Sequence, residues 1–159
     1  MKNRLRAMRL RLVAMVVVVA VLAGLAASAQ ATPGAAARLR VRSTEYGKAL
    51  FGPSGKVLYV FGADRRSKSN CYGVCAAAWP PLFTSAAPVA AEGVEAKLLG
   101  MTKRRDGRLQ VTYKGHPLYY YSADKVGKVM CQHATMHGGL WLMIKPNGQP
   151  NMAKGKMHM

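Results

Sequence analysis

Short apolar and aromatic runs separated by turn residues dominate the chain from Leu39 onward. The runs cover residues 48–51, 56–61, 97–103, 108–113, 117–121 and 140–144. Their boundaries are rich in Gly, Pro, Asn and Asp, as in Gly52-Pro53-Ser54-Gly55 and Pro146-Asn147-Gly148. Runs of this length with such boundaries are typical of strands joined by hairpin turns. The pattern therefore predicts a mainly β fold made of short antiparallel strands and hairpins.

The same pattern occurs twice, at an offset of 60 residues. Residues 58–64 read Leu-Tyr-Val-Phe-Gly-Ala-Asp, and residues 118–124 read Leu-Tyr-Tyr-Tyr-Ser-Ala-Asp. Gly47, Gly55 and Cys71 are also matched by identical residues sixty positions later. Seven identities in a single register indicate two copies of one supersecondary unit.

The repeat predicts how the chain is divided. We expect one compact two-repeat β domain over residues 39–148, with the first repeat at about 45–82 and the second at about 97–146. The Ala-rich residues 85–93 would link the two repeats. Cys71 to Pro81 is typical of a short helical turn that the two prolines end.

The ends of the chain have a different composition. Basic residues precede an apolar stretch from Leu12 to Leu25, which small residues follow, and this is the layout of a secretory signal peptide over residues 1–29. The alternative is an uncleaved membrane anchor. Residues 30–38 are expected to form a flexible leader, and residues 149–159 a disordered basic Met/His tail.

The net charge is strongly positive. Loss of residues 1–29 removes five of the 24 Lys and Arg and none of the six Asp and Glu, which leaves the exported chain near +13. Such a charge favours contact with polyanions. Outside the cell these would be anionic envelope polymers or phospholipid head groups rather than nucleic acid; the alternative is a solvated basic face without a partner. The basic clusters are Arg38, Arg40 and Arg42; Arg65, Arg66 and Lys68; and Lys103, Arg104, Arg105 and Arg108.

Each repeat has two aromatic residues spaced two apart and an aspartate three residues later. A strand points both rings to one face, where core or cross-strand packing is the usual role. An aspartate that follows a strand commonly accepts hydrogen bonds from backbone amides, and a structural role is favoured over a catalytic one. Trp79, just before the Pro-Pro break, is a candidate core residue. The motif residues are Tyr59, Phe61, Asp64, Tyr119, Tyr121, Asp124, Trp79 and Trp141.

Three cysteines lie in the exported part, where thiols tend to oxidise: Cys71, Cys75 and Cys131. An odd number leaves at least one cysteine without an intramolecular partner. Cys71 with Cys75 is the favoured disulfide because Gly73 lets the chain curl between them. The repeat offset makes Cys71 with Cys131 the rival pairing, and spacing alone does not choose between them.

Residues 130–137 combine thioether, thiol and imidazole groups. A helical turn would place two imidazoles four residues apart on one side. The candidate ligands are Met130, Cys131, His133, Met136 and His137. Thioether and thiolate sulfur suit Cu(I) and imidazole accepts Cu(II), so copper is the metal that this set would bind. The alternative is that the methionines fill gaps in a core and the histidines are exposed.

These motifs resemble a known family, the bacterial secreted-repeat proteins, also described as predicted lipoproteins with a Tyr-x-(Phe/Trp/Tyr)-x-x-Asp motif. The similar segments are 59–64, 69–76, 79–81, 106–107, 113–124 and 138–141, and the resemblance covers about residues 45–146. It implies an extracytoplasmic repeat domain whose biochemical role is not established. The lipid-attachment cysteine of many relatives is missing, so the resemblance does not imply a lipid anchor. The segment 130–137 is also richer in Met and His than expected of the family.

No nucleophile elbow, phosphate-binding glycine loop or metalloprotease helix occurs, and carboxylates for acid-base chemistry are few. We therefore expect a non-enzymatic exported domain, binding or structural in role and associated with the cell envelope. The first alternative is copper binding or buffering through residues 130–137. The second is an accessory role in envelope redox chemistry or electron transfer.

Overall fold

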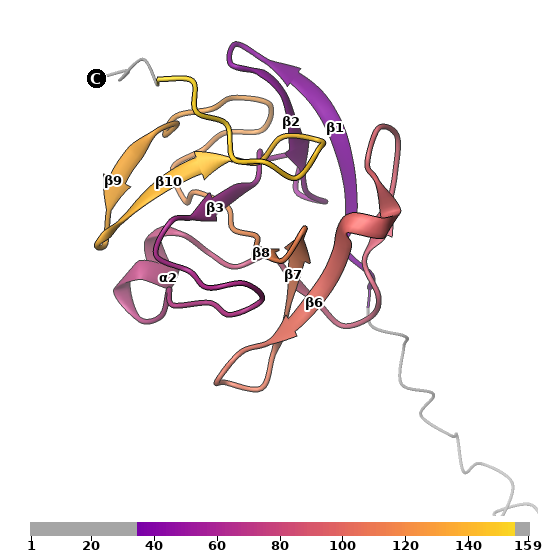
Figure 1. The fold of residues 1–159 in the computed structure, drawn as a ribbon, viewed down its shortest axis with the longest axis vertical. Helices are drawn as coiled ribbons and strands as arrows, with labels where there is room; N and C mark the ends of the chain where they lie inside the picture. Colours follow the sequence, from indigo (N-terminus) through magenta and orange to yellow (C-terminus); the bar gives the residue numbers. More distant parts are fainter. Residues whose placement is uncertain (1–34, 155–159) are drawn as a thin grey trace, which may run out of the picture. The chain divides into compact units, whose positions relative to one another are not determined.

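The computed structural model describes residues 35–154. The expected signal peptide, most of the leader and the last five residues of the tail lie outside the described residues. The described chain forms three small sheets with one short helix, which confirms the predicted mainly β class (Figure 1). The repeats therefore fold as hairpins and short strands that share one compact domain.

The first sheet contains the N-terminal hairpin. Strand β1 (Arg38–Thr44) pairs antiparallel with β2 (Gly47–Phe51), with Thr44 opposite Gly47. On its other side β1 pairs in parallel with β5 (Val89–Ala90). Because β5 lies inside the expected linker 85–93, that segment is part of the sheet.

The second sheet contains the matching hairpin of repeat two. Strand β6 (Leu99–Lys103) pairs antiparallel with β7 (Leu109–Tyr113), as the sequence predicts. β7 also pairs with β4 (Phe83–Thr84) and with β8 (His116–Pro117). A single 3₁₀ turn, η1 (Ala96–Leu98), leads into β6.

The third sheet joins the two repeats. Strand β10 (Gly139–Met143) lies between β3 (Tyr59–Phe61) and β9 (Ala134–Met136), antiparallel to both. The helix α2 (Val74–Ala78) ends before the two prolines. Strands that are sixty or more residues apart in sequence are thus neighbours in this sheet (Figure 1).

Backbone hydrogen bonds show that the repeats are related by exchange. In the first half, Leu58 N–H donates to Leu50 O and Ile144 N–H donates to Leu58 O. In the second half the corresponding pairs are Leu118 N–H to Val111 O and Leu82 N–H to Leu118 O. Ile144, which follows the second hairpin in the sequence, is therefore bonded beside the first hairpin. Leu82, which follows the first hairpin in the sequence, is bonded beside the second.

Tyr59 and Tyr119 form the bridge between the halves. Their backbone groups exchange two hydrogen bonds, of 2.9 and 3.0 Å between N and O. Alternation along these strands then divides the core in two, with Tyr59 and Phe61 in one cluster and Leu58 and Val60 in the other. The first cluster holds both tryptophans, and the second is mostly aliphatic.

Residues 149–154 are held against the domain, which corrects the expectation of a disordered tail starting at 149. Asn151 is buried, and its side chain donates from Nδ2 to Tyr46 O at 2.8 Å. The Gln132 side chain donates to Asn151 O and Ala153 O. The sequence of residues 149–154 has no periodic pattern and does not indicate these hydrogen bonds, because their partners lie far away in the chain. Residues 155–159 lie outside the described part.

Candidate functional site

The centre of the domain is a row of four aromatic rings. Phe61 stacks on Trp141 with 4.2 Å between ring centroids, and Trp141 stacks on Trp79 at 4.0 Å with planes 5° apart. Tyr121 lies on the other side of Trp79 at 4.5 Å. Gly139 makes room for this row, because a Cβ at that position would collide with the Phe61 ring. Both tryptophans are fully buried.

Two further rings meet this row edge-on. Tyr59 is T-shaped to Trp79, with centroids 5.1 Å apart, and Tyr119 is T-shaped to Trp141 at 5.2 Å. Stacked and edge-to-face arrangements are the two that the ring quadrupole favours. Each contact on one side has its counterpart on the other, with the repeats exchanged. The motif tyrosines and tryptophans thus pack the interface between the repeats.

Tyr59 and Tyr119, the first tyrosine of each motif, each donate a hydrogen bond to the aspartate of the other repeat. Tyr59 Oη donates to Asp124 Oδ2 at 2.8 Å, and Tyr119 Oη donates to Asp64 Oδ2 at 2.7 Å. The second oxygen of each carboxyl group accepts a backbone N–H six residues further on, from Asn70 in one repeat and Met130 in the other. The two Tyr-x-x-x-x-Asp motifs therefore interlock, and both aspartates organise the loops that follow them.

Burial shifts the pKa values of these carboxyl and phenol groups. The pKa of Asp64 is raised to about 6 by burial, against the lowering effects of the Asn70 amide, the Tyr119 hydroxyl and the Arg104 charge. Burial also raises the pKa of Asp124, again opposed by hydrogen bonds. The pKa of each partner tyrosine is raised by burial and by its aspartate, so both phenols are hydrogen-bond donors at physiological pH.

Arg104 is a buried part of this network, although its sequence context places it in a solvated basic cluster. Its side chain is only 1% exposed. Nη1 donates to Ser69 Oγ and to Gln110 Oε1, both at 2.7 Å, and Nη2 donates to Cys71 O at 2.6 Å. Ser69 in turn bonds Tyr119 Oη. Arg104 is one of four basic residues within six positions, and nothing in that sequence pattern distinguishes the one that turns inward. The sequence therefore does not predict this buried network.

The cysteines follow the favoured pairing. Cys71 and Cys75 form a disulfide with Cα atoms 5.3 Å apart, at the start of α2. Cys131 is a half-buried free thiol, so the rival Cys71–Cys131 bond is not formed. Burial and the nearby Asp124 carboxylate raise the pKa of the Cys131 thiol. The repeats therefore share a cysteine position but differ in its chemistry.

The segment 130–137 is not the helical turn that the sequence suggested. β9 occupies residues 134–136, and the two histidines flank it with φ angles of +58° at His133 and +54° at His137. Within residues 35–154 no group of three or more His, Cys, Asp or Glu side chains is placed to hold a metal ion. Met130 is exposed, whereas Met136 packs against the ring cluster. Copper binding by this segment stays a prediction.

These contacts define the class of protein: a two-repeat β domain in which the repeats interlock through reciprocal aromatic and Tyr–Asp contacts. A family model described as a secreted repeat of unknown function matches residues 40–83 and again residues 100–135. Together the two matches cover half of the chain, and the chain belongs to this family. The boundaries of the matches enclose one hairpin and one aromatic motif each.

No curated protein and no solved structure matches the chain. The family description places the protein among exported ones, and the Cys71–Cys75 disulfide agrees with an oxidising compartment. Over the described residues, no helix has the length and apolar character that crossing a bilayer requires.

Proposed function

We propose that the protein is a non-enzymatic exported domain that binds anionic polymers of the cell envelope through one basic face. The observation that carries the proposal is the composition of this face. It consists of seven exposed basic residues from the loop after β3, the β6–β7 hairpin and the β7–β8 turn: Arg65, Arg66, Lys68, Lys103, Arg105, Arg108 and Lys114. Asp106 is the exposed acid within it, and it pairs with Arg108 at 2.7 Å.

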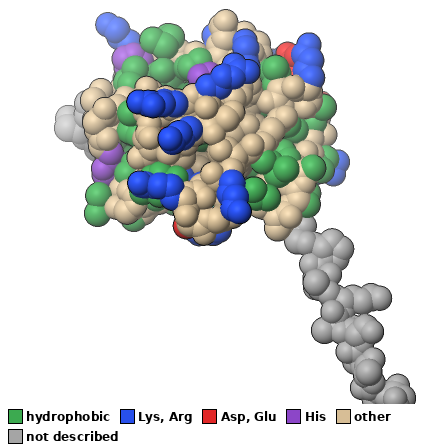
Figure 2. All heavy atoms as spheres, turned by 60° about the horizontal axis from the view of Figure 1, so that its bottom comes forward, with side chains coloured by type: hydrophobic (Ala, Val, Ile, Leu, Met, Phe, Trp, Pro, Cys, Tyr) green, Lys and Arg blue, Asp and Glu red, His purple; other side chains and the backbone are tan. Residues whose placement is uncertain are grey.

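The three segments of the basic face are joined by hydrogen bonds. Ser67 N–H donates to Gly115 O at 2.7 Å, and Thr102 Oγ1 donates to Ser67 O. In Figure 2 the Lys and Arg side chains gather on the surface seen when the lower edge of Figure 1, with the β6–β7 turn, is brought forward. A fixed arrangement of charges supports binding because fewer side chains must be ordered by the polymer.

Aromatic rings hold two of these guanidinium groups. Arg105 lies over the Tyr72 ring, 3.9 Å from its centroid, and Arg108 lies over the Phe83 ring at 4.0 Å. Stacking on a ring leaves the edge of a guanidinium group open to bind phosphate or carboxylate. These contacts favour arginine-based binding of anions on this face.

A shallow hollow of about 300 Å³ lies within the face and is lined by Arg66 and Lys114, among others. The positive potential there reaches His116, whose pKa is lowered by burial and by the Lys114 and Arg66 charges. A negatively charged group would reduce this mutual repulsion. The hollow is therefore a suitable place for one anionic unit of a polymer.

The proposal predicts a face-specific salt dependence. The triple variant Arg65→Glu, Arg66→Glu and Lys68→Glu should elute from a phosphocellulose column at a much lower salt concentration than the unmodified protein, because contacts between exposed charges are screened by salt. The matched control is Lys48→Glu, Lys125→Glu and Lys154→Glu, which changes the net charge equally at exposed positions elsewhere.

The control variant should keep most of the retention. Equal loss in both variants would mean that only net charge matters and would contradict a dedicated face. Binding to vesicles of anionic phospholipid, measured with the same variants, distinguishes head groups from polymers. Stronger face-dependent binding to vesicles than to a soluble polyphosphate would replace the polymer with a membrane surface.

A further inference from the structure

The environment of Arg104 has a counterpart in the other half of the domain. β1 and β6 are the equivalent first strands of the two hairpins, and Thr44 at the end of β1 corresponds to Arg104 just beyond β6. The loops that face them correspond as well, because Asn70 and Met130 donate equivalent backbone bonds to Asp64 and Asp124. The two halves can thus be compared position by position.

In one half the space between strand end and loop is filled, and in the other it is open. Arg104 fills it in the first case, bound to Ser69 and Cys71 O of the loop. In the second case Thr44 has a short side chain, which is folded back onto Gly47 O and the Tyr46 amide. A pocket of about 480 Å³ lies there. Its lining residues are Thr44, Glu45, Gly127, Lys128, Val129 and Met130.

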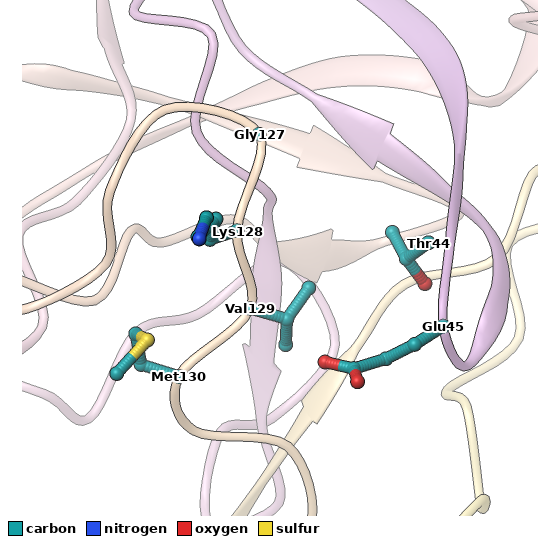
Figure 3. Close-up of a pocket in the computed structure, with 6 residues that line it drawn as sticks. All are labelled: Thr44, Glu45, Gly127, Lys128, Val129 and Met130. Atoms are coloured by element: carbon teal, nitrogen blue, oxygen red, sulfur yellow. The ribbon is translucent and has the colours of Figure 1, made fainter. Parts of the chain in front are cut away.

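The walls of this pocket are partly apolar and its rim carries a carboxylate. Figure 3 shows Val129 and Met130 on the loop side, with the Glu45 carboxylate extending from the β1–β2 turn toward Val129. Val129 stands where the other half has Ser69, so the loop side of this pocket is less polar. Asp124 is buried and is not a lining residue; its carboxylate accepts the Met130 backbone N–H.

Glu45 is the acidic residue among the six that line this pocket. In the other half, Asp64 sits in the electrostatic field of the Arg104 guanidinium. The pKa of Asp124 is lowered instead by the charge of Lys56, whose ammonium group lies 3.3 Å from Ser122 O. A ligand with an apolar stem and a delocalised cation matches the apolar wall and the Glu45 carboxylate together.

We propose that the pocket between the β1–β2 turn and residues 127–130 binds the guanidinium group of an arginine side chain supplied by another molecule. The cation would face the Glu45 carboxylate, and its methylene stem would lie on Val129 and Met130. The site is distinct from the basic face, since it takes the opposite charge.

Lys128 on the rim does not exclude this ligand. Its equivalent in the filled half is Lys68, which is likewise exposed and coexists there with the buried Arg104 guanidinium. Its backbone N–H makes the same turn bond as Lys68, to the residue three positions earlier. An exposed ammonium group is screened by solvent and adds little repulsion at this position.

The test is a titration of the full exported chain with butylguanidinium, followed by NMR through the methyl groups of Val129 and Met130. Butylurea, which has the same shape and no charge, is the matched ligand control. Saturable shifts with butylguanidinium are expected, with a Kd on the order of 1 mM for so small a ligand. Butylurea should shift these methyl groups much less at equal concentration.

Two variants of the pocket and one control variant make the result specific. Thr44→Arg places a guanidinium in the pocket as Arg104 does in the other half, and should abolish the shifts. Glu45→Gln keeps the shape and should weaken binding about tenfold through loss of one charge-assisted contact. Lys48→Arg adds a guanidinium group elsewhere on the hairpin and should leave the titration unchanged.

Equal binding of butylurea, or no saturable shift with the unmodified protein, would overturn the proposal. Undiminished binding in Glu45→Gln would also contradict it, independently of whether Thr44→Arg folds. None of these results depends on the basic face, so the proposed binding of polyanions would stand or fall separately.

Discussion

Replacing Trp141 with alanine should lower the free energy of unfolding by about 3–5 kcal/mol, the range found for large aromatic residues removed from cores. Trp141 touches Phe61, Trp79 and Tyr119, so its loss opens the centre of the ring row. It also removes the indole N–H that donates to Met136 O. A domain of this size has about 5–15 kcal/mol in total, so much of its stability would be lost.

Urea denaturation followed by circular dichroism measures this effect. Val74→Ala is the matched control, because it removes an apolar side chain that is 79% exposed, on α2. That substitution should change the free energy of unfolding by less than about 0.5 kcal/mol. A cost below about 1 kcal/mol for Trp141→Ala would show that the ring row is not the centre of the core.

Replacing Arg104 with alanine should have an effect of similar size, about 3–5 kcal/mol, which is the cost of removing one member of a buried charged network. The substitution leaves Ser69, Gln110 and the Cys71 carbonyl without their donor. It also removes the Arg104 charge that lowers the pKa of the buried Asp64 carboxyl group. The pKa of Asp64 would therefore rise further above its present value of about 6.

Arg105→Ala is the control for charge and for ring stacking. Both guanidinium groups lie over the Tyr72 ring, at 4.2 Å for Arg104 and 3.9 Å for Arg105, but the second is exposed. We expect its removal to cost less than about 1 kcal/mol in urea denaturation at neutral pH. Equal costs for the two variants would mean that the hydrogen bonds of Arg104 contribute nothing beyond stacking.

The repeat and the role of the aromatic motif could be predicted from the sequence. Identities at a fixed offset survive because equivalent positions have equivalent surroundings, as Tyr59 and Tyr119 do. The spacing of Tyr59 and Phe61 placed both rings on one face, and they do pack in one cluster. Gly73 between Cys71 and Cys75 was compatible with the disulfide that forms.

The partners across the repeat interface could not be predicted. Each tyrosine is five residues from the aspartate of its own repeat, yet it bonds the aspartate of the other. The choice of partner depends on how the two repeats pack against each other. The local sequence pattern carries no information about that packing. The inward turn of Arg104 has a similar origin, because two of its three acceptors, Ser69 Oγ and Cys71 O, belong to the other repeat.

The pocket beside Thr44 could not be predicted from the sequence either. It arises from a difference between equivalent positions, a long side chain at Arg104 and a short one at Thr44, and the offset of 60 residues does not show that the arginine turns inward. The sequence directed attention instead to the histidines of residues 130–137, which flank a strand rather than share one side of a helix.

A double-mutant cycle tests the exchange of the repeats most directly. Tyr59→Phe and Asp124→Asn, alone and together, should show a coupling free energy of about 1.5–3 kcal/mol, as expected for a hydrogen bond to a charged group. Tyr59→Phe with Asp64→Asn, the pair within one repeat, should be nearly additive. Stronger coupling of Tyr59 to Asp64 than to Asp124 would contradict the interlocked arrangement.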